Sequence, residues 1–375
     1  MEFTQCFYVK MVFMPTQSLK LLNQLPLLDP TSLHEATQKA IADIVSEGES
    51  QNTRNSYKSA MKYWAVWYRM RYNQAFTFPL QVPVVLQFIV DHAVRHTPTG
   101  DTIGLPAELD VFLVENKFKA QRGHFSIATL LHRLAVLSKA HQIAFASPNP
   151  CKDPRVQELI GKTQKAYAKK GMHSVQRPAL TKEPLAQLLE TCDDSIKGLR
   201  DRALILFAWA SGGRRRSEVS DAHFDRLIHK PETGDYLYLL LYSKTNQTGQ
   251  ASANAYKPVS GQAAQALANW IAASQIKNGY IFRQVNKGGA IGEKLSPVSV
   301  NNIIKSRCKQ AGLSEEYSAH SLRSGFVTEA ARQNIPIAET MLMTGHQNIN
   351  TLMRYYREGN VLESKASKLF DSPAE

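Results

Sequence analysis

A short C-terminal stretch carries four side chains whose types suit chemistry on a phosphodiester. His320 and Arg323 stand three residues apart, so on a helix both share one face. His346 follows a glycine, and Tyr355 comes nine residues after that histidine. Arginine matches phosphate oxygens with a planar fork of donors, histidine exchanges a proton near neutral pH, and a tyrosine hydroxyl can act as a covalent nucleophile. The order and spacing therefore favour nucleophilic attack on a phosphate.

Two motifs give this stretch a family resemblance. HSLRSG and then TGH, with a tyrosine nine residues after the second histidine, resemble the C-terminal signature of tyrosine recombinases, the lambda-integrase, Xer and Cre family. Taken singly, His-x-x-Arg is a common chance pattern and Tyr-Tyr is usually half-buried packing; the joint order makes the resemblance specific. Tyr356 points about 100° away from Tyr355 on a helix. The nine-residue spacing selects Tyr355 as the nucleophile.

The resemblance implies an upstream arginine and a supporting acid. The family carries Gly-Leu-Arg-x-Ser-Glu, and here Arg215-Arg216-Ser217-Glu218 fits Arg-x-Ser-Glu. Arg215 then falls on the first catalytic arginine, and Glu218 on the acid that orients its neighbours. Arg214 departs from the pattern, since the family usually has an apolar residue there. Three consecutive arginines leave the register slightly open, and Ser217-Glu218 decides it for Arg215.

The resemblance also implies a catalytic lysine in a β-hairpin. Residues 235–260 change to strand character, with DYLYLLLYS followed by a turn and a second strand at about 253–259. Lys244 in the turn is the first choice and Lys257 the second. Lysines in hairpins are commonly no more than solvated surface, so this assignment rests on the resemblance alone.

The implied reaction is a transesterification without ATP, metal or cofactor. Tyr355 attacks the scissile phosphate, giving a 3′-phosphotyrosyl bond and a free 5′-hydroxyl, while Arg215 and Arg323 clamp the non-bridging oxygens. No cluster of Asp and Glu stands at metal-ligand spacing, and two arginines could do a metal's electrostatic work. The implied catalytic set is Arg215, Glu218, Lys244, His320, Arg323, His346 and Tyr355.

The remaining roles concern hydrogen bonds and protons. His346 adds a hydrogen bond to the phosphate oxygens, Lys244 protonates the departing 5′-oxygen, and His320 assists proton transfer at the tyrosine. Exchange of strands would pass through a Holliday junction and need four protomers. We therefore expect the chain to bind double-stranded DNA at a specific site as a homotetramer, with or without an accessory DNA-binding protein. We expect no membrane partner.

Composition agrees with a DNA-binding protein but does not prove it. The chain has 375 residues, which favours two domains, and a net charge of +13 with a pI of about 9.5. Ribosomal and membrane-surface proteins share such charge. No apolar run approaches the roughly 18 residues of a spanning helix, and the N-terminus lacks a signal-peptide pattern, with Met1 and Met14 both open as the start. Four scattered cysteines fit a reducing bacterial cytoplasm or nucleoid: Cys6, Cys151, Cys192 and Cys308.

The expected fold is mainly α with a small antiparallel β-sheet, in a two-domain C-shaped clamp. No strand pattern interrupts residues 30–165, so the N-terminal half is predicted to be all-helical, like the core-binding domain of Cre-like recombinases, and the C-terminal half to be a mixed α+β catalytic domain. The expected divisions are an irregular extension at 1–28, a helical core-binding domain at 29–165, a basic linker at 166–179, a catalytic domain at 180–360 and a tail docking in trans at 361–375.

Basic residues suggest where DNA would lie. A helix capped at Thr53 carries many cations, and the run 152–177 holds seven Lys or Arg against two Asp or Glu. A helix from Ser296 to Gly312 bears Asn, Lys and Arg on its outer faces. Plain solvated surfaces and a solvated tether are the open alternatives. The candidate DNA contacts are Arg54, Lys58, Lys62, Arg133, Lys169, Lys170, Asn301, Asn302 and Lys305.

Two other functions stay open at this point. A type IB topoisomerase uses almost the same residues but reseals the same strand as a monomer. A repressor or accessory factor could keep the fold and bind DNA without catalysis. The helical N-terminal half and the apolar tail residues favour the recombinase over the topoisomerase, and the full catalytic set weighs against a protein that only binds.

Overall fold

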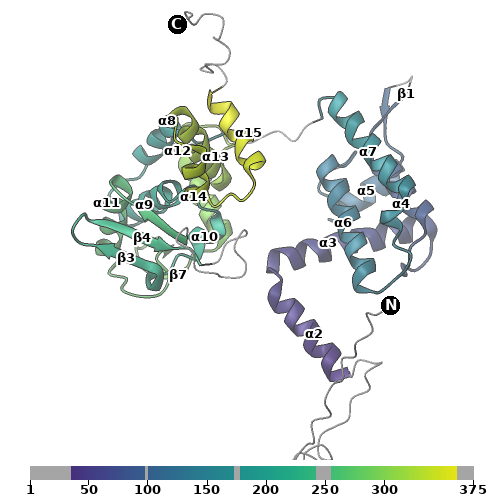
Figure 1. Cartoon of the computed structure of the whole chain (residues 1–375), viewed down its shortest axis with the longest axis horizontal. Helices are drawn as coiled ribbons and strands as arrows, with labels where there is room; N and C mark the ends of the chain where they lie inside the picture. The colour runs from purple at the N-terminus through teal and green to yellow at the C-terminus, as the bar shows by residue number, and fades with distance from the viewer. Residues whose placement is uncertain (1–34, 98–99, 173–177, 242–254, 361–375) are drawn as a thin grey trace, which may run out of the picture. The chain divides into compact units, whose positions relative to one another are not determined.

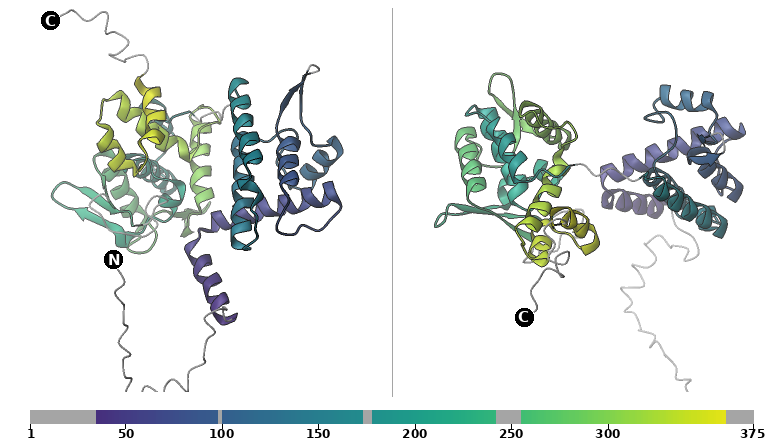
Figure 2. Two further views of the ribbon diagram at one scale, coloured as in Figure 1. Left: turned by 45° about the vertical axis from the view of Figure 1, so that its right-hand side comes forward. Right: turned by 90° about the horizontal axis from the view of Figure 1, so that it is seen from above.

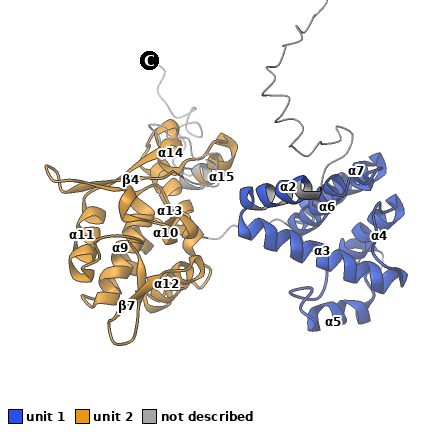
Figure 3. Cartoon of the chain, turned by 90° about the horizontal axis from the view of Figure 1, so that it is seen from below, with its two compact units in different colours: residues 1–174 blue, residues 175–375 orange. Residues whose placement is uncertain are grey.

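The computed structural model describes residues 35–97, 100–172, 178–241 and 255–360. The chain divides into two compact units, Met1–Ser174 and Val175–Glu375 (Figure 3). We call them unit 1 and unit 2 and describe each by itself. Lys244, Cys6 and the C-terminal tail lie outside the described residues.

Unit 1 is mostly helical (Figure 1). Its elements are α2 (Glu35–Gly48), α3 (Gln51–Tyr72), α4 (Val82–His92), β1 (Arg95–Thr97), β2 (Gly100–Thr102), α5 (Ala107–Glu115), α6 (Ile127–Ile143), the 3-10 turn η1 (Pro150–Lys152) and α7 (Pro154–Lys169).

Aromatic side chains fill the core of unit 1. The rings of Trp64 and Phe88 stack with centroids 3.6 Å apart, and Trp67 packs edge-on against both. Helix α3 starts earlier than predicted, because the hydroxyl of Ser50, and not that of Thr53, accepts the capping hydrogen bond, from the backbone N–H of Thr53 at 3.1 Å. The cap therefore lies three residues before the predicted Thr53.

Two predictions about unit 1 are wrong in detail. The N-terminal half is not all-helical, since β1 and β2 pair as a short antiparallel hairpin. The basic run at 152–177, interpreted as a linker that lies along the DNA backbone with a solvated tether as the alternative, is no linker up to Lys169, because α7 occupies Pro154–Lys169. Val156, Ile160 and Tyr167 form a buried stripe on that helix. The prediction weighed the charges and overlooked this apolar spacing.

Unit 2 combines helices with small antiparallel sheets, as predicted for a mixed α+β domain. Its elements are α8 (Lys182–Glu190), α9 (Ile196–Ala210), α10 (Arg216–Ser220), η2 (Phe224–Arg226), β3 (Leu227–Lys230), β4 (Asp235–Leu239), β5 (Tyr256–Val259), α11 (Gln262–Ser274), β6 (Arg283–Val285), β7 (Ile291–Lys294), α12 (Pro297–Gln310), α13 (Ala319–Arg332), α14 (Ile337–Thr344) and α15 (Ile349–Asn360).

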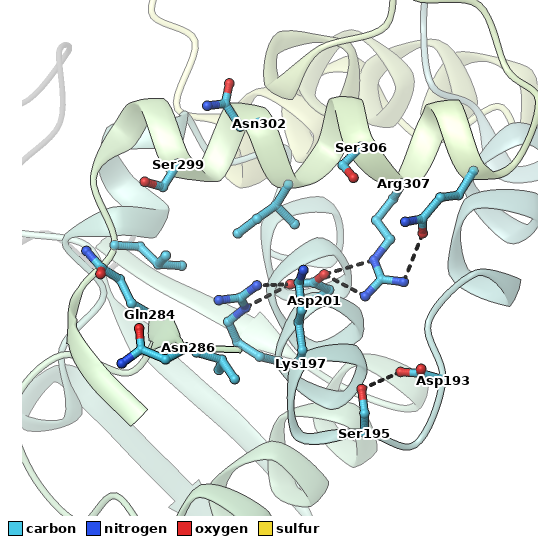
Figure 4. A pocket seen from close by; sticks show the side chains of 15 residues that line it. Asp193, Ser195, Lys197, Asp201, Gln284, Asn286, Ser299, Asn302, Ser306 and Arg307 are labelled. Atoms are coloured by element: carbon cyan, nitrogen blue, oxygen red, sulfur yellow. Dashed lines mark hydrogen bonds and ion pairs between the residues drawn. The ribbon is translucent and has the colours of Figure 1, made fainter. Parts of the chain in front are cut away.

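Helix α9 runs through the core of unit 2 and begins at Ile196, about two turns before Ala203, where the apolar pattern of the sequence predicts a helix that ends at Ala210. Its charged start misled the prediction, because Arg200 and Asp201 are both buried. The Nε atom of Arg200 donates to Asp201 at 2.7 Å, and that of Arg307 donates to the same carboxylate at 2.8 Å (Figure 4). This ion-pair triad ties α9 to α12 and satisfies the buried charges.

The three-stranded sheet of unit 2 has the order β3-β4-β5, and both strand pairs are antiparallel. Tyr236 and Tyr238 of β4 face inward, against the core that surrounds α9. At the other end of the chain, α15 packs along α13 in every view (Figure 1 and Figure 2). This packing brings a residue of α15 to the start of α13, where the predicted chemistry begins. Among the described residues, no helix is both long and apolar enough to cross a membrane.

Candidate active site

Arg215 begins the site, at the N-cap of α10. Its backbone N–H donates to one oxygen of Glu218 at 3.0 Å, and its Nη1 atom donates to the other oxygen at 2.7 Å. The Arg215 side chain is 27% exposed and that of Glu218 only 5%. The carboxylate therefore holds the arginine from behind, while part of the guanidinium stays open to a ligand.

A pair of glycines lets the loop before Arg215 approach the rest of the site. Gly212 and Gly213 have φ values of +97° and +68°, a region that side chains with a Cβ rarely adopt. A Cβ on Gly213 would lie 2.5 Å from the Cα of Arg323, and one on Gly212 would lie 2.2 Å from the carbonyl oxygen of Met343. Only glycine fits at either position.

Arg323, on the first turns of α13, is almost fully buried. Its Nη1 atom donates to the carbonyl of Gly213 at 3.1 Å, and its Nη2 atom donates to the carbonyl of Thr344 at 2.6 Å. Burial, followed by the nearby charges of Arg215 and Arg214, lowers the pKa of Arg323 to about 9. The site thus concentrates positive charge at a desolvated position, which an incoming phosphate would neutralise.

His346 follows the end of α14 and contacts Arg323. The Nη2 atom of Arg323 lies 3.3 Å from its Nε2 atom, and its Nδ1 atom lies 2.7 Å from the hydroxyl oxygen of Thr344. Since arginine can only donate, Nε2 accepts and Nδ1 carries the proton. Burial first, and then the neighbouring arginines, lower the pKa of His346 to about 3. The imidazole is therefore neutral in the absence of a ligand.

His320 and Tyr355 complete the cluster. The Nε2 atom of His320 lies 3.1 Å from the hydroxyl of Tyr355, and the two rings meet edge-on. His320 stands on α13 one turn before Arg323, so both side chains leave the helix on one face, as the three-residue spacing predicted. The side chain of Tyr356 lies outside what the structure describes.

Glu218 balances the arginines. Burial acts to raise the pKa of its carboxyl group, but Arg214 and Arg215 outweigh that effect, and the net pKa is lowered. The carboxylate therefore stays ionised at neutral pH beside several cations. Among the described residues, no group of His, Cys, Asp and Glu is arranged to hold a metal ion.

The two candidate lysines have different outcomes. Lys244 falls outside the described residues, so its predicted role stays a prediction. Lys257 lies on β5, is buried, and donates through Nζ to the carbonyl of Leu342 on α14. Burial, followed by the charge of Arg214, lowers the pKa of Lys257 to about 8. The second choice therefore sits beside the arginine cluster.

Arg214 is the residue whose importance sequence reasoning missed. It is 1% exposed and donates to the carbonyls of Gly212 and Met343. In the sequence it stood out only as a departure from the family's apolar residue. A charged residue in place of an apolar one, directly after two glycines, was a signal that the side chain is buried and paired.

The candidate DNA contacts of unit 1 lie on its helices at varied exposure. Lys58 and Lys62 are exposed on α3, with Lys62 over the ring of Phe118, and Arg54 is exposed near the start of that helix. Arg133 of α6 is half-buried over the ring of Tyr63.

The candidates farther along the chain are also divided. Lys169 is exposed on the last turn of α7, and Lys170 is half-buried at its C-cap. The side-chain oxygen of Asn301 accepts from the backbone N–H of Ala319, so it holds the start of α13 in place. Asn302 and Lys305 of α12 are exposed. Their roles on DNA stay predictions.

A second concavity of unit 2 lies beneath α12 (Figure 4). It measures about 580 Å³, and its lining combines neutral polar side chains such as Gln284, Ser299 and Ser306 with apolar and charged ones, including Asp193, Lys197 and the triad of Arg200, Asp201 and Arg307. It shares no lining residue with the cluster around Arg323.

Comparisons with known proteins identify relatives of this chain. The sequence model described as the phage integrase family matches residues 178–360. The chain is 31% identical over 246 residues to an integrase/recombinase xerD homolog of Selenomonas ruminantium, covering 64% of this chain and 70% of the relative. It is 27% identical over 169 residues to a tyrosine recombinase of Synechocystis sp., covering 43% of this chain and 49% of that relative.

Solved structures share the fold at low sequence identity. A XerH site-specific recombinase bound to palindromic difH substrate in a post-cleavage complex has a TM-score of 0.53 and 16% identity, covering 95% of this chain and 88% of that one. A lambda integrase(75-356) dimer bound to a COC′ core site has a TM-score of 0.51 and 16% identity, with 86% and 95% covered. These likenesses establish the fold, as predicted.

Proposed function

The chain belongs to the phage integrase family and is a tyrosine recombinase, an enzyme of site-specific DNA recombination, and we propose that Tyr355 carries the reaction through a 3′-phosphotyrosyl intermediate. The observation that carries the proposal is the contact between Tyr355 and His320, beside the buried pair of Arg323 and His346. Nucleophile, proton acceptor and phosphate ligands thus belong to one site in unit 2.

The first step exchanges one phosphodiester for another. The phenolic oxygen of Tyr355 attacks the scissile phosphorus, a P–O bond to tyrosine forms, and the P–O bond to the 5′-oxygen breaks. The phenolic proton passes to His320, whose Nε2 atom is within hydrogen-bond distance, and a proton is delivered to the leaving 5′-oxygen. The energy of the phosphodiester is kept in the tyrosyl ester, so neither ATP nor another co-reactant is consumed.

Arg215 and Arg323 bind the non-bridging oxygens as negative charge builds on them. Both are held before the substrate arrives, Arg215 by Glu218 and Arg323 by the carbonyls of Gly213 and Thr344. Such preorganisation avoids reorientation of dipoles during the step. His346, next to Arg323, would supply a further hydrogen bond to the phosphate from Nε2 once that nitrogen gains a proton, since the negative charge of the bound phosphate offsets the arginines that keep the ring neutral.

The proton for the 5′-oxygen comes from a lysine, with Lys244 as the first choice and Lys257 as the alternative. A buried lysine with a lowered pKa gives up its proton more readily, and this favours considering Lys257. In the absence of DNA, however, its Nζ atom donates a hydrogen bond to the carbonyl of Leu342. This contact favours a role in holding the end of α14 in place. The two roles are separated by the leaving-group experiment below.

The partner is double-stranded DNA with a specific site. The net charge of +13 and the exposed Lys58, Lys62, Asn302 and Lys305 support it. Reversal of the first step with a different 5′-hydroxyl exchanges strands, and a complete cycle takes four protomers around two duplexes and passes through a Holliday junction. Residues 361–375, which lie outside the described residues, would dock on a neighbouring protomer. We place the reaction in the bacterial cytoplasm, where the free cysteines Cys151, Cys192 and Cys308 stay reduced.

The proposal is tested by trapping covalent DNA. Purified protein is mixed with sheared DNA from its own source, quenched with detergent, and the DNA that stays bound to protein is sequenced. Recurrent fragments with a common sequence support site-specific recombination. Relaxation of plasmids without any preferred site would instead indicate a topoisomerase, and DNA binding without a covalent product would indicate a protein that only binds.

A further inference from the structure

Arg214 joins two segments that are far apart in the sequence. Its Nη2 atom donates to the carbonyl of Gly212 at 3.1 Å and to that of Met343 at 2.6 Å. The side chain is 1% exposed. Since nothing in solvent can reach a guanidinium buried to this degree, its bonds serve the protein and not the DNA.

Arg323 makes the same pair of bonds one residue further along both segments. It joins the carbonyl of Gly213 to that of Thr344, at 3.1 and 2.6 Å. The two guanidinium groups therefore cross-link the same two stretches of backbone side by side. Arg323 also contacts His346, whereas Arg214 shares with Arg323 only the cross-link between the two backbone segments.

Two of these carbonyls, those of Met343 and Thr344, belong to the end of α14. The last carbonyls of a helix have no intrahelical partner, and together they carry partial negative charge, so cations bind well there. Three cationic side chains each donate a hydrogen bond to one of three consecutive backbone carbonyls, an arrangement that we call the carbonyl clamp. Its contacts are Lys257 to Leu342, Arg214 to Met343 and Arg323 to Thr344.

The carbonyl clamp holds the residue that precedes His346 by two. The hydroxyl oxygen of Thr344 accepts a hydrogen bond from the Nδ1–H of His346, with 2.7 Å between the two heavy atoms, and Gly345 between these residues has a φ of +69°. A shift of the end of α14 would therefore move the imidazole away from Arg323. A misplacement of about 1 Å can cost a reaction roughly a hundredfold in rate.

Arg214 also takes part of the charge of Glu218. Its Nη1 atom lies 3.7 Å from one carboxylate oxygen, while Arg215 binds the other oxygen at 2.7 Å. Without Arg214, the carboxylate would act on Arg215 alone and compete more strongly with a phosphate for that guanidinium. Both effects of Arg214 thus act through other residues of the site.

We propose that Arg214 is a positioning residue of the recombination reaction, which fixes the end of α14, and with it His346, through the carbonyl clamp. This inference rests on the proposed function. It assigns a task to the one position of the Arg-x-Ser-Glu region where the sequence departs from the family, and it predicts that this task affects cleavage of bound DNA and not the binding of DNA.

The test compares Arg214→Leu, Arg214→Lys and the matched control Arg216→Leu, since Arg216 is the exposed neighbour in the same triplet. Leucine is similar to the apolar residue that the family usually has at this position, so we expect Arg214→Leu to fold. With a trapped recombination site as substrate, at saturating protein, Arg214→Leu should cleave about a hundredfold more slowly than wild type. Arg214→Lys, which keeps the charge and one donor, should be about tenfold slower. The DNA dissociation constant should change less than threefold in both, and Arg216→Leu should cleave bound DNA at the wild-type rate.

A second readout needs neither cleavage nor DNA. At pH 7 the nitrogen-15 shifts of His346, identified by its loss in His346→Gln, should report the neutral ring with the proton on Nδ1 in the wild type. Arg214→Leu should give averaged shifts of both tautomers, and Arg214→Lys shifts between these and the wild type. If Arg214→Leu does not fold, the test rests on Arg214→Lys alone. A cleavage rate and nitrogen-15 shifts between those expected for Arg214→Leu and those of wild type then support the inference.

Wild-type shifts of His346 together with wild-type cleavage in a folded Arg214 variant would overturn the positioning role. If wild-type protein itself forms no covalent DNA, the proposed function is what fails, and the His346 shifts still decide whether Arg214 positions the ring.

Discussion

The Nε2 atom of His320 lies 3.1 Å from the hydroxyl oxygen of Tyr355, across 35 residues of sequence and two different helices. The contact depends on α15 packing along α13, because the tyrosine comes from one helix and the histidine from the first turn of the other. A base this close to a phenol can take its proton as the phenol attacks. We interpret the pair as the nucleophile and its proton acceptor.

Removal of this base should slow formation of the covalent bond without weakening DNA binding. General base catalysis contributes about 10²- to 10⁴-fold, so His320→Ala should form covalent DNA at least 10²-fold more slowly than wild type. Single-turnover rates on the trapped site, with gel-shift affinities beside them, measure this. His229→Ala, at an exposed histidine of β3, is the control. Equal rates for the two variants would exclude His320 from proton transfer.

The glycine pair before the arginines should not tolerate alanine. Gly213→Ala would place a Cβ 2.5 Å from the Cα of Arg323 at a φ of +68°, which combines overpacking with backbone strain. We expect a loss of about 2–5 kcal/mol in the free energy of unfolding of unit 2. Gly234→Ala is the matched control, because its φ is +74° but nothing lies within 4 Å. It should cost about 1–2 kcal/mol, from strain alone. If urea unfolding gave the same loss of unfolding free energy for Gly213→Ala and Gly234→Ala, the close contact between Gly213 and Arg323 would not be rigid.

Acid should destabilise both units through neutral buried histidines. Burial lowers the pKa of His92, whose Nε2 atom meets the hydroxyl of Tyr63, and that of His346, each to about 3. Unfolded histidine titrates near 6.5, so between about pH 6.5 and 3 the unfolded state binds protons that the folded state does not. Stability is therefore complete above about pH 6.5 and falls as the pH decreases towards 3.

Hydrogen exchange at pH 7.5 and pH 5 measures this separately for each unit. His92→Gln should weaken the pH dependence of unit 1 alone, and His346→Gln that of unit 2 alone. Identical protection of both units at the two pH values would contradict the assignment of neutral imidazoles.

Two lysines compete for the role of proton donor, and the leaving group distinguishes them. A substrate with sulfur in place of the 5′-bridging oxygen leaves as a thiolate and needs no proton. If Lys244 is the donor, Lys244→Ala should be slow on the oxygen substrate, by about 10²-fold, and regain most of the rate on the sulfur substrate. Lys257→Ala should be slow on both, because its contact with Leu342 holds α14. Rescue of Lys257→Ala and not of Lys244→Ala would exchange the two roles.

Some relationships in unit 2 follow from local spacing in the sequence. The three residues from His320 to Arg323 match helical periodicity, so their shared face was predictable. Short strands such as β6 and β7 escaped, because three or four residues contain too little pattern. The start of α9 escaped as well, since its buried Asp201 pairs with Arg307, more than a hundred residues away, in addition to its neighbour Arg200.

The same reason explains what was missed in the site. Arg214 and Lys257 contact the end of α14 from distant parts of the chain, and no local pattern indicates a bond to a backbone carbonyl. Sequence motifs identify side chains that touch a substrate. Glu218, which holds Arg215, stood in such a motif, whereas Arg214 and Lys257, which hold the end of α14, became visible only in the structure.

Mass spectrometry can identify the residue that forms the covalent bond to DNA. Trapped complexes are digested with nuclease and protease, and the peptide that carries a nucleotide is sequenced. We expect a nucleotide on Tyr355, joined through a 3′-phosphate, and no adduct with Tyr355→Phe, while Tyr356→Phe still forms one. A nucleotide on Tyr356, or an adduct that survives Tyr355→Phe, would contradict this expectation.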